Sequence, residues 1–118
     1  MKHSAEYYIE HLEMEPHVEG GYFKECLLEK EERNLWSSIY FMLAKGEVSH
    51  FHRLKSDEVW YYHDGNALTI YMIDEAGKLT AAKLGLDLEK GEVPQVLVPK
   101  GMIFGSAMEE EGFSLVGC

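Results

Sequence analysis

The sequence predicts an all-β fold, either a sandwich or a barrel, preceded by one short helix. Short apolar runs rich in β-branched and aromatic side chains follow one another along the chain, which favours strands. Turn signals, chiefly glycine beside a charged or polar residue, recur between these runs. Many short strands at regular spacing are typical of sandwiches and barrels. The length of 118 residues indicates a single domain over residues 1–118.

The helix is expected near the N-terminus. Ser4 can cap it, because a serine side chain accepts from a free amide of the first turn. Tyr8 and Leu12 share one face at i, i+4 spacing, and the helix should end before Pro16. The predicted strands then follow in chain order as 22–28, 35–43, 48–53, 58–63, 67–73, 79–84, 95–98, 102–106 and 113–116.

Composition argues against several classes of partner. The formal net charge of -10 repels the phosphates of nucleic acids and disfavours an anionic membrane surface. No apolar run approaches the roughly 20 residues that span a bilayer, and the N-terminus lacks the apolar centre of a signal peptide. Cys26 and Cys118 form no CxxC pair, so we expect a cytoplasmic protein whose cysteines are free thiols and inert core residues.

The pair His50 and His52 is the strongest functional signal. The two residues fall on one predicted strand, and side chains at i and i+2 point to the same face. Glu58, on the next strand, can approach them across a short turn. Two imidazoles and a carboxylate inside a barrel would suit a metal site or an acid–base site. The alternatives are a hydrogen-bonded histidine pair in a polar interior and a salt bridge from Glu58 to Arg53 or Lys55.

Aromatic side chains and one lysine suggest a binding pocket near these groups. Lys24 alternates onto the same strand face as Tyr22 and Cys26. An aromatic pocket with one cation suits a flat or sugar-like ligand that carries a negative group. The alternative is that most of the aromatic residues form the barrel core. The expected lining consists of Tyr22, Lys24, Tyr40, Trp60, Tyr62 and Phe104.

The segment that leads into the first long strand is expected to be a shaped turn. His17 opens it, and Gly20 and Gly21 supply backbone angles that other residues rarely adopt.

The spacing of the histidine segment resembles the first motif of the cupin superfamily, which reads Gly, His-x-His, Glu, six residues, Gly. Here it appears as Gly46, His50-Phe51-His52, Glu58 and Gly65. The interval from the second histidine to Glu58 is one residue longer than usual, which makes Asp57 a competing carboxylate.

The second cupin motif normally reads Gly, Pro-x-Gly, then a histidine. Gly91 and Pro99-Lys100-Gly101 match it, but Phe104 stands where the histidine belongs. The resemblance therefore implies a metal site without its usual fourth ligand.

A narrower resemblance, to the small cupin 5 (DUF985-type) group of unassigned function, covers nearly the whole chain. It implies a double-stranded β-helix, or jelly roll, of two antiparallel sheets with a short N-terminal helix. It also fits a homodimer formed by edge-strand pairing. The matching segments are 12–25, 39–43, 49–60, 94–99 and 113–118.

Proteins of this group are similar in structure to deoxysugar-nucleotide 3,5-epimerases, which implies acid–base chemistry on a small-molecule ligand. One histidine would remove a proton beside a carbonyl, and Tyr40 or Tyr62 would return one from the other face. Lys24 would contact an anionic group of the substrate.

Two other functions remain open at this point. One is a metal-dependent dioxygenase or isomerase that holds Fe, Mn, Ni or Zn on His50, His52 and Glu58. The other is a sensor or binding module that holds its ligand without turnover.

Overall fold

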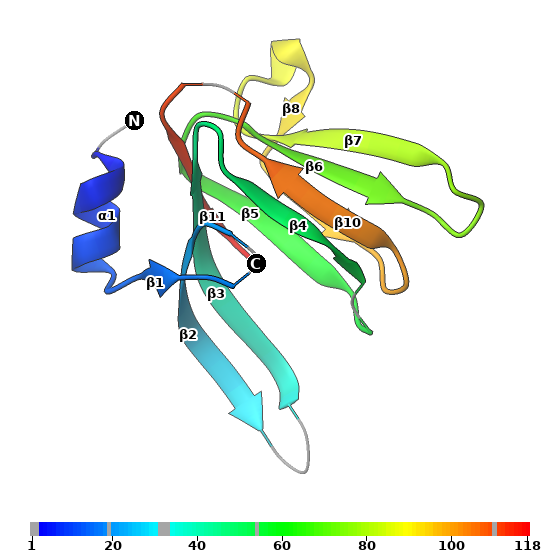
Figure 1. Cartoon of the computed structure of the whole chain (residues 1–118), viewed down its shortest axis with the longest axis horizontal. Helices are drawn as coiled ribbons and strands as arrows, with labels where there is room; N and C mark the ends of the chain where they lie inside the picture. The colour runs from blue at the N-terminus through cyan, green and yellow to red at the C-terminus, as the bar shows by residue number, and fades with distance from the viewer. Residues whose placement is uncertain (1–2, 19, 31–33, 54, 110) are drawn as a thin grey trace.

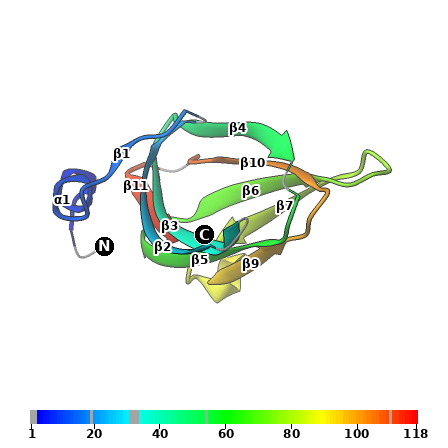
Figure 2. The same cartoon turned by 90° about the horizontal axis from the view of Figure 1, so that it is seen from below.

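Two β-sheets face each other across an apolar core, as Figures 1 and 2 show. The computed structural model describes residues 3–18, 20–30, 34–53, 55–109 and 111–118, with the backbone alone described over 26–30 and 34–37. The first sheet has the spatial order β1 (Glu15–Pro16), β2 (Tyr22–Lys30), β3 (Asn34–Ala44), β11 (Phe113–Gly117), β5 (Glu58–Gly65) and β9 (Gln95–Val98). The second has the order β4 (Val48–Arg53), β10 (Ile103–Ala107), β6 (Leu68–Ile73), β7 (Leu79–Leu84) and β8 (Glu92–Val93).

The predicted all-β architecture with a short N-terminal helix is confirmed. The bounds of β4, β7 and β9 are those predicted, and the other long strands differ only at their ends. Two short strands, β1 and β8, and the 3₁₀ turn η1 (Leu88–Lys90) were not predicted. A two-residue strand has no alternation to read, so only its long-range pairing reveals it.

Helix α1 (Ala5–His11) covers the outer face of the first sheet. The Ser4 side chain caps it by accepting from the backbone N–H of Tyr7 at 3.1 Å, as expected. The apolar side of the helix packs on the outward side chains of β3 and β11, so the inner face of the sheet stays available for the second sheet. The residues of this outer cluster include Tyr8, Ile9, Leu12, Met42, Phe113 and Leu115. Within the described ranges, no helix is long and apolar enough to cross a membrane.

The main core lies between the two sheets. Its buried residues alternate with exposed ones along β9, as half-buried strands require, and Trp60 of β5 is buried beside them. Both sheets contribute, through side chains such as Leu43 and Val116 on one side and Leu68 and Ile70 on the other. The core leaves a hollow beside Trp60 and Phe104, where the two sheets are lined by polar as well as apolar groups.

Candidate functional site

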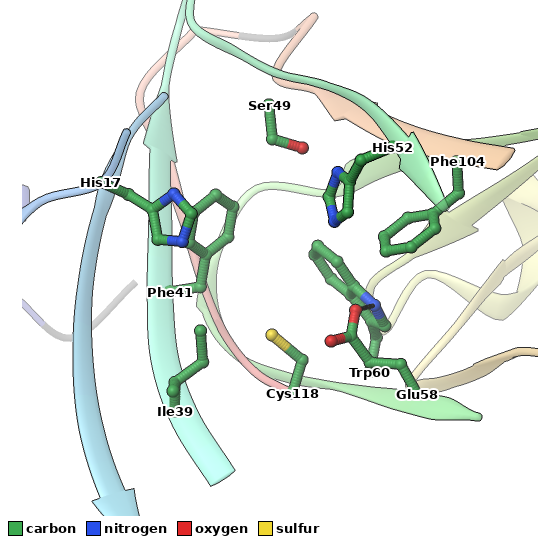
Figure 3. Close-up of a pocket in the computed structure, with 9 residues that line it drawn as sticks. All are labelled: His17, Ile39, Phe41, Ser49, His52, Glu58, Trp60, Phe104 and Cys118. Atoms are coloured by element: carbon green, nitrogen blue, oxygen red, sulfur yellow. Dashed lines mark hydrogen bonds between the residues drawn. The ribbon is translucent and has the colours of Figure 1, made fainter. Parts of the chain in front are cut away.

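A pocket between the two sheets brings polar groups from several elements onto an apolar wall. It encloses about 350 Å³ of space, its open mouth included. Figure 3 shows the side chains that line it, with His17 on one side and His52 and Glu58 on the other. The lining consists of His17, Ile39, Phe41, Ser49, His52, Glu58, Trp60, Phe104 and Cys118.

An irregularity in β4 decides which histidine enters this pocket. On β10, Phe104 pairs with His52 and Ser106 pairs with Ser49, so β4 carries one more residue than β10 between these pairs. This bulge puts Ser49 and His52 on the inner face. A Cβ on Gly105, which lies opposite the bulge, would come within 2.9 Å of the Ser49 carbonyl oxygen. Glycine therefore allows the two backbones to approach.

The expectation that both histidines face the pocket is wrong, because the bulge breaks the alternation of β4. His50 is exposed and does not line the pocket, whereas His52 is half-buried and does. The i, i+2 rule holds only for a regular strand, and β4 is not regular at this point.

Glu58 lies in the pocket through the regular alternation of β5, as does Trp60. Oε1 of Glu58 accepts a hydrogen bond from Nε1 of Trp60 at 2.7 Å. Burial raises the pKa of the Glu58 carboxyl, while the Trp60 hydrogen bond and the nearby His52 act in the opposite direction. The competing carboxylate Asp57 instead accepts from the backbone N–H of Lys100 at 2.8 Å. Glu58 is thus the acidic group of the site.

The His52 ring is held in one tautomer by its own strand. Its Nδ1 lies 3.0 Å from the carbonyl oxygen of His50. A carbonyl oxygen only accepts, so the proton of the neutral ring belongs on Nδ1 and Nε2 is left as a proton acceptor. The ring also packs against Phe104, with centroids 4.5 Å apart. Figure 3 shows the ring directed into the pocket on the same side as Glu58.

His17 is a pocket residue that the sequence reading assigned only to a turn. Its backbone N–H donates to the carbonyl oxygen of Gly21 at 2.9 Å, and its carbonyl accepts from the N–H of Gly20 at 3.0 Å. The expected glycine turn is confirmed, since both glycines have positive φ. This turn directs the imidazole inward, where it packs edge-on to Phe23 and Phe41. Only the tertiary packing reveals this position.

Ser49 and Cys118 also contribute polar atoms to the lining. The Oγ atoms of Ser49 and Ser106 lie 2.7 Å apart, so this hydroxyl is tied to β10. Cys118 is half-buried and packs against the main core, as expected, and its side chain also lines the pocket (Figure 3). The side chain of Cys26 lies outside the described residues.

Three of the expected pocket residues lie on the wrong face of the first sheet. Lys24 pairs with Tyr40 and Phe23 pairs with Phe41, and it is the phenylalanine pair that packs against the main core, with Phe41 lining the pocket. Tyr22 and Tyr40 belong to the outer cluster beneath α1. Lys24 lines a separate surface hollow together with three glutamates, Glu13, Glu15 and Glu25. It is therefore not placed as an anion contact in the barrel.

Tyr62 is also not in the pocket, although it follows Glu58 and Trp60 in the alternation of β5. Its hydroxyl donates to the carbonyl oxygen of Gly65 at 2.6 Å, and the side chain lines a different hollow beside Glu92. Of the expected site residues, the structure brings together His52, Glu58, Trp60 and Phe104. The others are His50, Tyr22, Lys24, Tyr40 and Tyr62, which lie elsewhere.

Comparison with known proteins assigns the family. Residues 6–118 match the family model described as the cupin superfamily (DUF985). The chain belongs to this cupin family. No curated protein matches the chain.

Solved structures agree with this assignment. This cupin is 59% identical in sequence to a protein from Shewanella oneidensis. The alignment covers 98% of this chain and 76% of the Shewanella protein, with a TM-score of 0.93. It is 34% identical to a hypothetical protein from Leishmania major, and the alignment covers 98% of this chain and 80% of the Leishmania protein, with a TM-score of 0.89. Oxalate decarboxylase from Bacillus subtilis is 19% identical, and the alignment covers 88% of this chain and 26% of the decarboxylase, with a TM-score of 0.62. At that identity the likeness concerns the fold alone.

The expected three-ligand metal site is not assembled in this cupin. His50 is exposed and does not line the pocket that holds Glu58, and Phe104 fills the position of the second-motif histidine with an apolar ring. Across the described ranges, no three His, Cys, Asp or Glu side chains are placed to hold a metal ion together. The donor groups of the pocket are arranged as a His52–Glu58 pair rather than as a ligand triad.

Proposed function

We propose that this cupin binds a small carbonyl compound in the pocket and moves a proton on the carbon beside the carbonyl, as isomerases and epimerases do. One observation carries the proposal. His52 and Glu58 line the same pocket, with Nε2 of His52 left as a proton acceptor and the pKa of Glu58 raised by burial. A base and an acid whose environments differ in this way are typical of acid–base catalysis.

The two groups have different roles in the proposed reaction. Nε2 of His52 removes the proton from the carbon, and the electron pair of that C–H bond moves toward the carbonyl. Glu58, in its protonated form, donates a hydrogen bond to the carbonyl oxygen as negative charge develops there. Trp60 fixes the carboxyl group through its indole N–H. Phe104 holds the face of the imidazole and excludes water from that side.

The lining also favours a particular substrate. Ile39, Phe41, Trp60 and Phe104 form an apolar and aromatic wall, which suits the apolar face of a small ring or chain. Among the described residues, neither lysine nor arginine lines this pocket. We therefore favour an uncharged substrate over the anionic one that Lys24 would have bound.

The test measures exchange of the α-proton with solvent. The purified cupin is incubated in D₂O with acetoin or glyceraldehyde, and loss of the α-proton signal is followed by NMR. We expect exchange above the protein-free rate, reduced by about 10²-fold or more in Glu58→Gln and, for the enantiomer whose α-proton faces His52, in His52→Gln. Matched controls are His50→Gln and Glu89→Gln, which replace exposed residues outside the pocket and should exchange as the wild type does. Equal rates in His50→Gln and His52→Gln would contradict the proposal.

A further inference from the structure

We infer that His17 is a second proton carrier of this site, facing the substrate from the side opposite His52, and that the reaction inverts a stereocentre beside an uncharged carbonyl. The inference rests on the proposed function and extends it, because it names the kind of stereochemical change and a residue with no expected catalytic role. It depends on where the structure places the two imidazoles.

A row of aromatic side chains separates the two imidazoles. Phe41 and Phe104 each contact Trp60, with ring centroids 5.9 Å and 6.2 Å apart. His17 packs edge-on to Phe41 at 5.9 Å, and His52 packs on Phe104 at 4.5 Å. The row therefore carries one imidazole at each end, and Figure 3 shows the two rings on opposite sides of the pocket. A small molecule lying on this aromatic wall would have one imidazole on each side.

The His17 ring is held by a surface turn. The neighbouring residue, Val18, is 92% exposed, whereas His17 is half-buried and lines the pocket. The turn is closed by the two backbone hydrogen bonds between His17 and the glycines that follow. It also fits closely against the first residues of β4, because a Cβ on Gly20 would meet the carbonyl oxygen of Val48 at 2.0 Å. The same strand carries His52, so one strand of the second sheet fixes the positions of both imidazoles.

His52 takes the proton from the carbon on its Nε2, and the C–H electron pair forms the carbon–carbon double bond of an enolate whose oxygen accepts a hydrogen bond from protonated Glu58. Protonated His17 then delivers its proton to the other face of the same carbon, and the carbonyl reforms. The product is the opposite stereoisomer, His52 is protonated and His17 is neutral. Exchange of protons with water resets the pair, and no oxidant or reductant is needed.

The position of His17 also replaces the expected role of tyrosine. Tyr40 lies under α1 and the Tyr62 hydroxyl is bonded to Gly65, so neither reaches the second face of a molecule in the pocket. The imidazole of His17 lies on that side of the pocket.

The experiment uses each enantiomer of a probe separately. The whole chain is incubated in D₂O with (R)- or (S)-acetoin and with D- or L-glyceraldehyde, and deuterium incorporation is compared with chiral analysis of the product. In the wild type we expect exchange from both enantiomers and racemisation. In His17→Gln we expect exchange from one enantiomer to fall about 10²-fold, exchange from the other to stay within about threefold, and racemisation to be lost. His52→Gln should show the opposite preference.

The outcomes separate this inference from the proposed function. If the wild type exchanges the probes but His17→Gln slows both enantiomers equally, or slows neither, His17 is not a second proton carrier and the one-sided chemistry of His52 and Glu58 stands. If the wild type exchanges no probe, the proposed function itself fails, and this inference fails with it. His50→Gln serves as the control, and circular dichroism of His17→Gln establishes that a selective effect comes from a folded protein.

Discussion

Nε1 of Trp60 donates a hydrogen bond to Oε1 of Glu58 at 2.7 Å, between two side chains that point into the same pocket from one strand. The bond orients a carboxyl group whose pKa is raised, with burial as the main cause. The folded protein therefore binds a proton at Glu58 at a higher pH than the unfolded chain does. This difference makes the stability contribution of Glu58 depend on pH.

The first prediction concerns the stability of Glu58→Gln. Because the folded pKa of Glu58 is raised above its ordinary value of 4.5, its contribution is fully present below pH 4.5 and is lost as the pH rises through the folded pKa. Glutamine stays neutral and can still accept from Trp60. We expect the variant to gain stability relative to the wild type between pH 4 and pH 7, measured by urea unfolding at several pH values. A difference in the free energy of unfolding that does not change with pH would contradict this prediction. Glu89→Gln, which replaces an exposed carboxylate, is the control.

Sequence alternation predicted the inward positions of Glu58 and Trp60 because β5 is regular over these residues. The same rule failed in β4, where the bulge opposite Gly105 turns His50 outward. A bulge is set by which strand lies alongside, and the pairing of β4 with β10 joins segments that lie far apart in the sequence. The spacing of the two histidines alone therefore could not predict which of them faces the pocket.

The faces of β2 and β3 were ambiguous for a different reason. Both are apolar, since one packs beneath α1 and the other faces the pocket. Alternation correctly grouped Lys24 with Tyr22, but nothing in the strand itself says which face is inside. His17 was missed because it lies in a turn, where no periodicity relates a side chain to the core. Such residues are found only from the packing of the whole chain.

The second prediction tests the turn that positions His17. Gly20→Ala places a Cβ 2.0 Å from the carbonyl oxygen of Val48 and at a φ of +110°, so both the clash and the backbone angle oppose folding. We expect the free energy of unfolding to fall by about 3–5 kcal/mol. Gly77→Ala is the matched control, since Gly77 also has a positive φ but open space around it, and should lose only about 1 kcal/mol. Chemical denaturation measures both, and equal losses would show that the contact with β4 is unimportant.

The third prediction concerns the metal ligand that the second cupin motif lacks. Phe104→His would place a third donor beside His52 and Glu58, which suffices for a Ni²⁺ or Zn²⁺ site. Phe104 is 1% exposed, so the apo variant should lose on the order of 2–3 kcal/mol of stability. We expect Ni²⁺ to raise the melting temperature of this variant by several degrees, about 1 kcal/mol or more.

Phe104→Leu is the control for this experiment, because it also removes the ring but adds no donor. Its melting temperature should not respond to Ni²⁺. A wild-type protein stabilised by the metal as strongly as Phe104→His would show that the added imidazole is not what matters, and would favour the metal-dependent alternative.

The fourth prediction concerns the homodimer expected from the sequence. Strand β9 lies at an edge of the first sheet, and Leu97 on it is 52% exposed beside the exposed Tyr61 of β5. An apolar edge of this kind can pair with a second copy. We expect sedimentation velocity to show a dimer that Leu97→Lys converts to a monomer, while Leu79→Lys on β7 has no effect. A monomeric wild type at about 50 µM would contradict dimer formation at the low-micromolar affinity expected of a specific interface.

The fifth prediction concerns the attachment of α1 to the sheet. The Tyr8 hydroxyl donates to Oδ2 of Asp64 at 2.7 Å, and this hydrogen bond, followed by burial and the charge of Asp64, raises the pKa of Tyr8 to about 12. The bond's contribution is therefore fully present below the ordinary tyrosine pKa of 10.0 and is lost only as the pH rises through about 12. At neutral pH we expect Tyr8→Phe to lose about 1 kcal/mol, because the bond is partly exposed to water. Tyr7→Phe, on the exposed face of the same helix, should change stability by less than about 0.5 kcal/mol in the same urea titration. Equal effects of the two substitutions would mean that packing of the ring, rather than its hydroxyl, holds the helix in place.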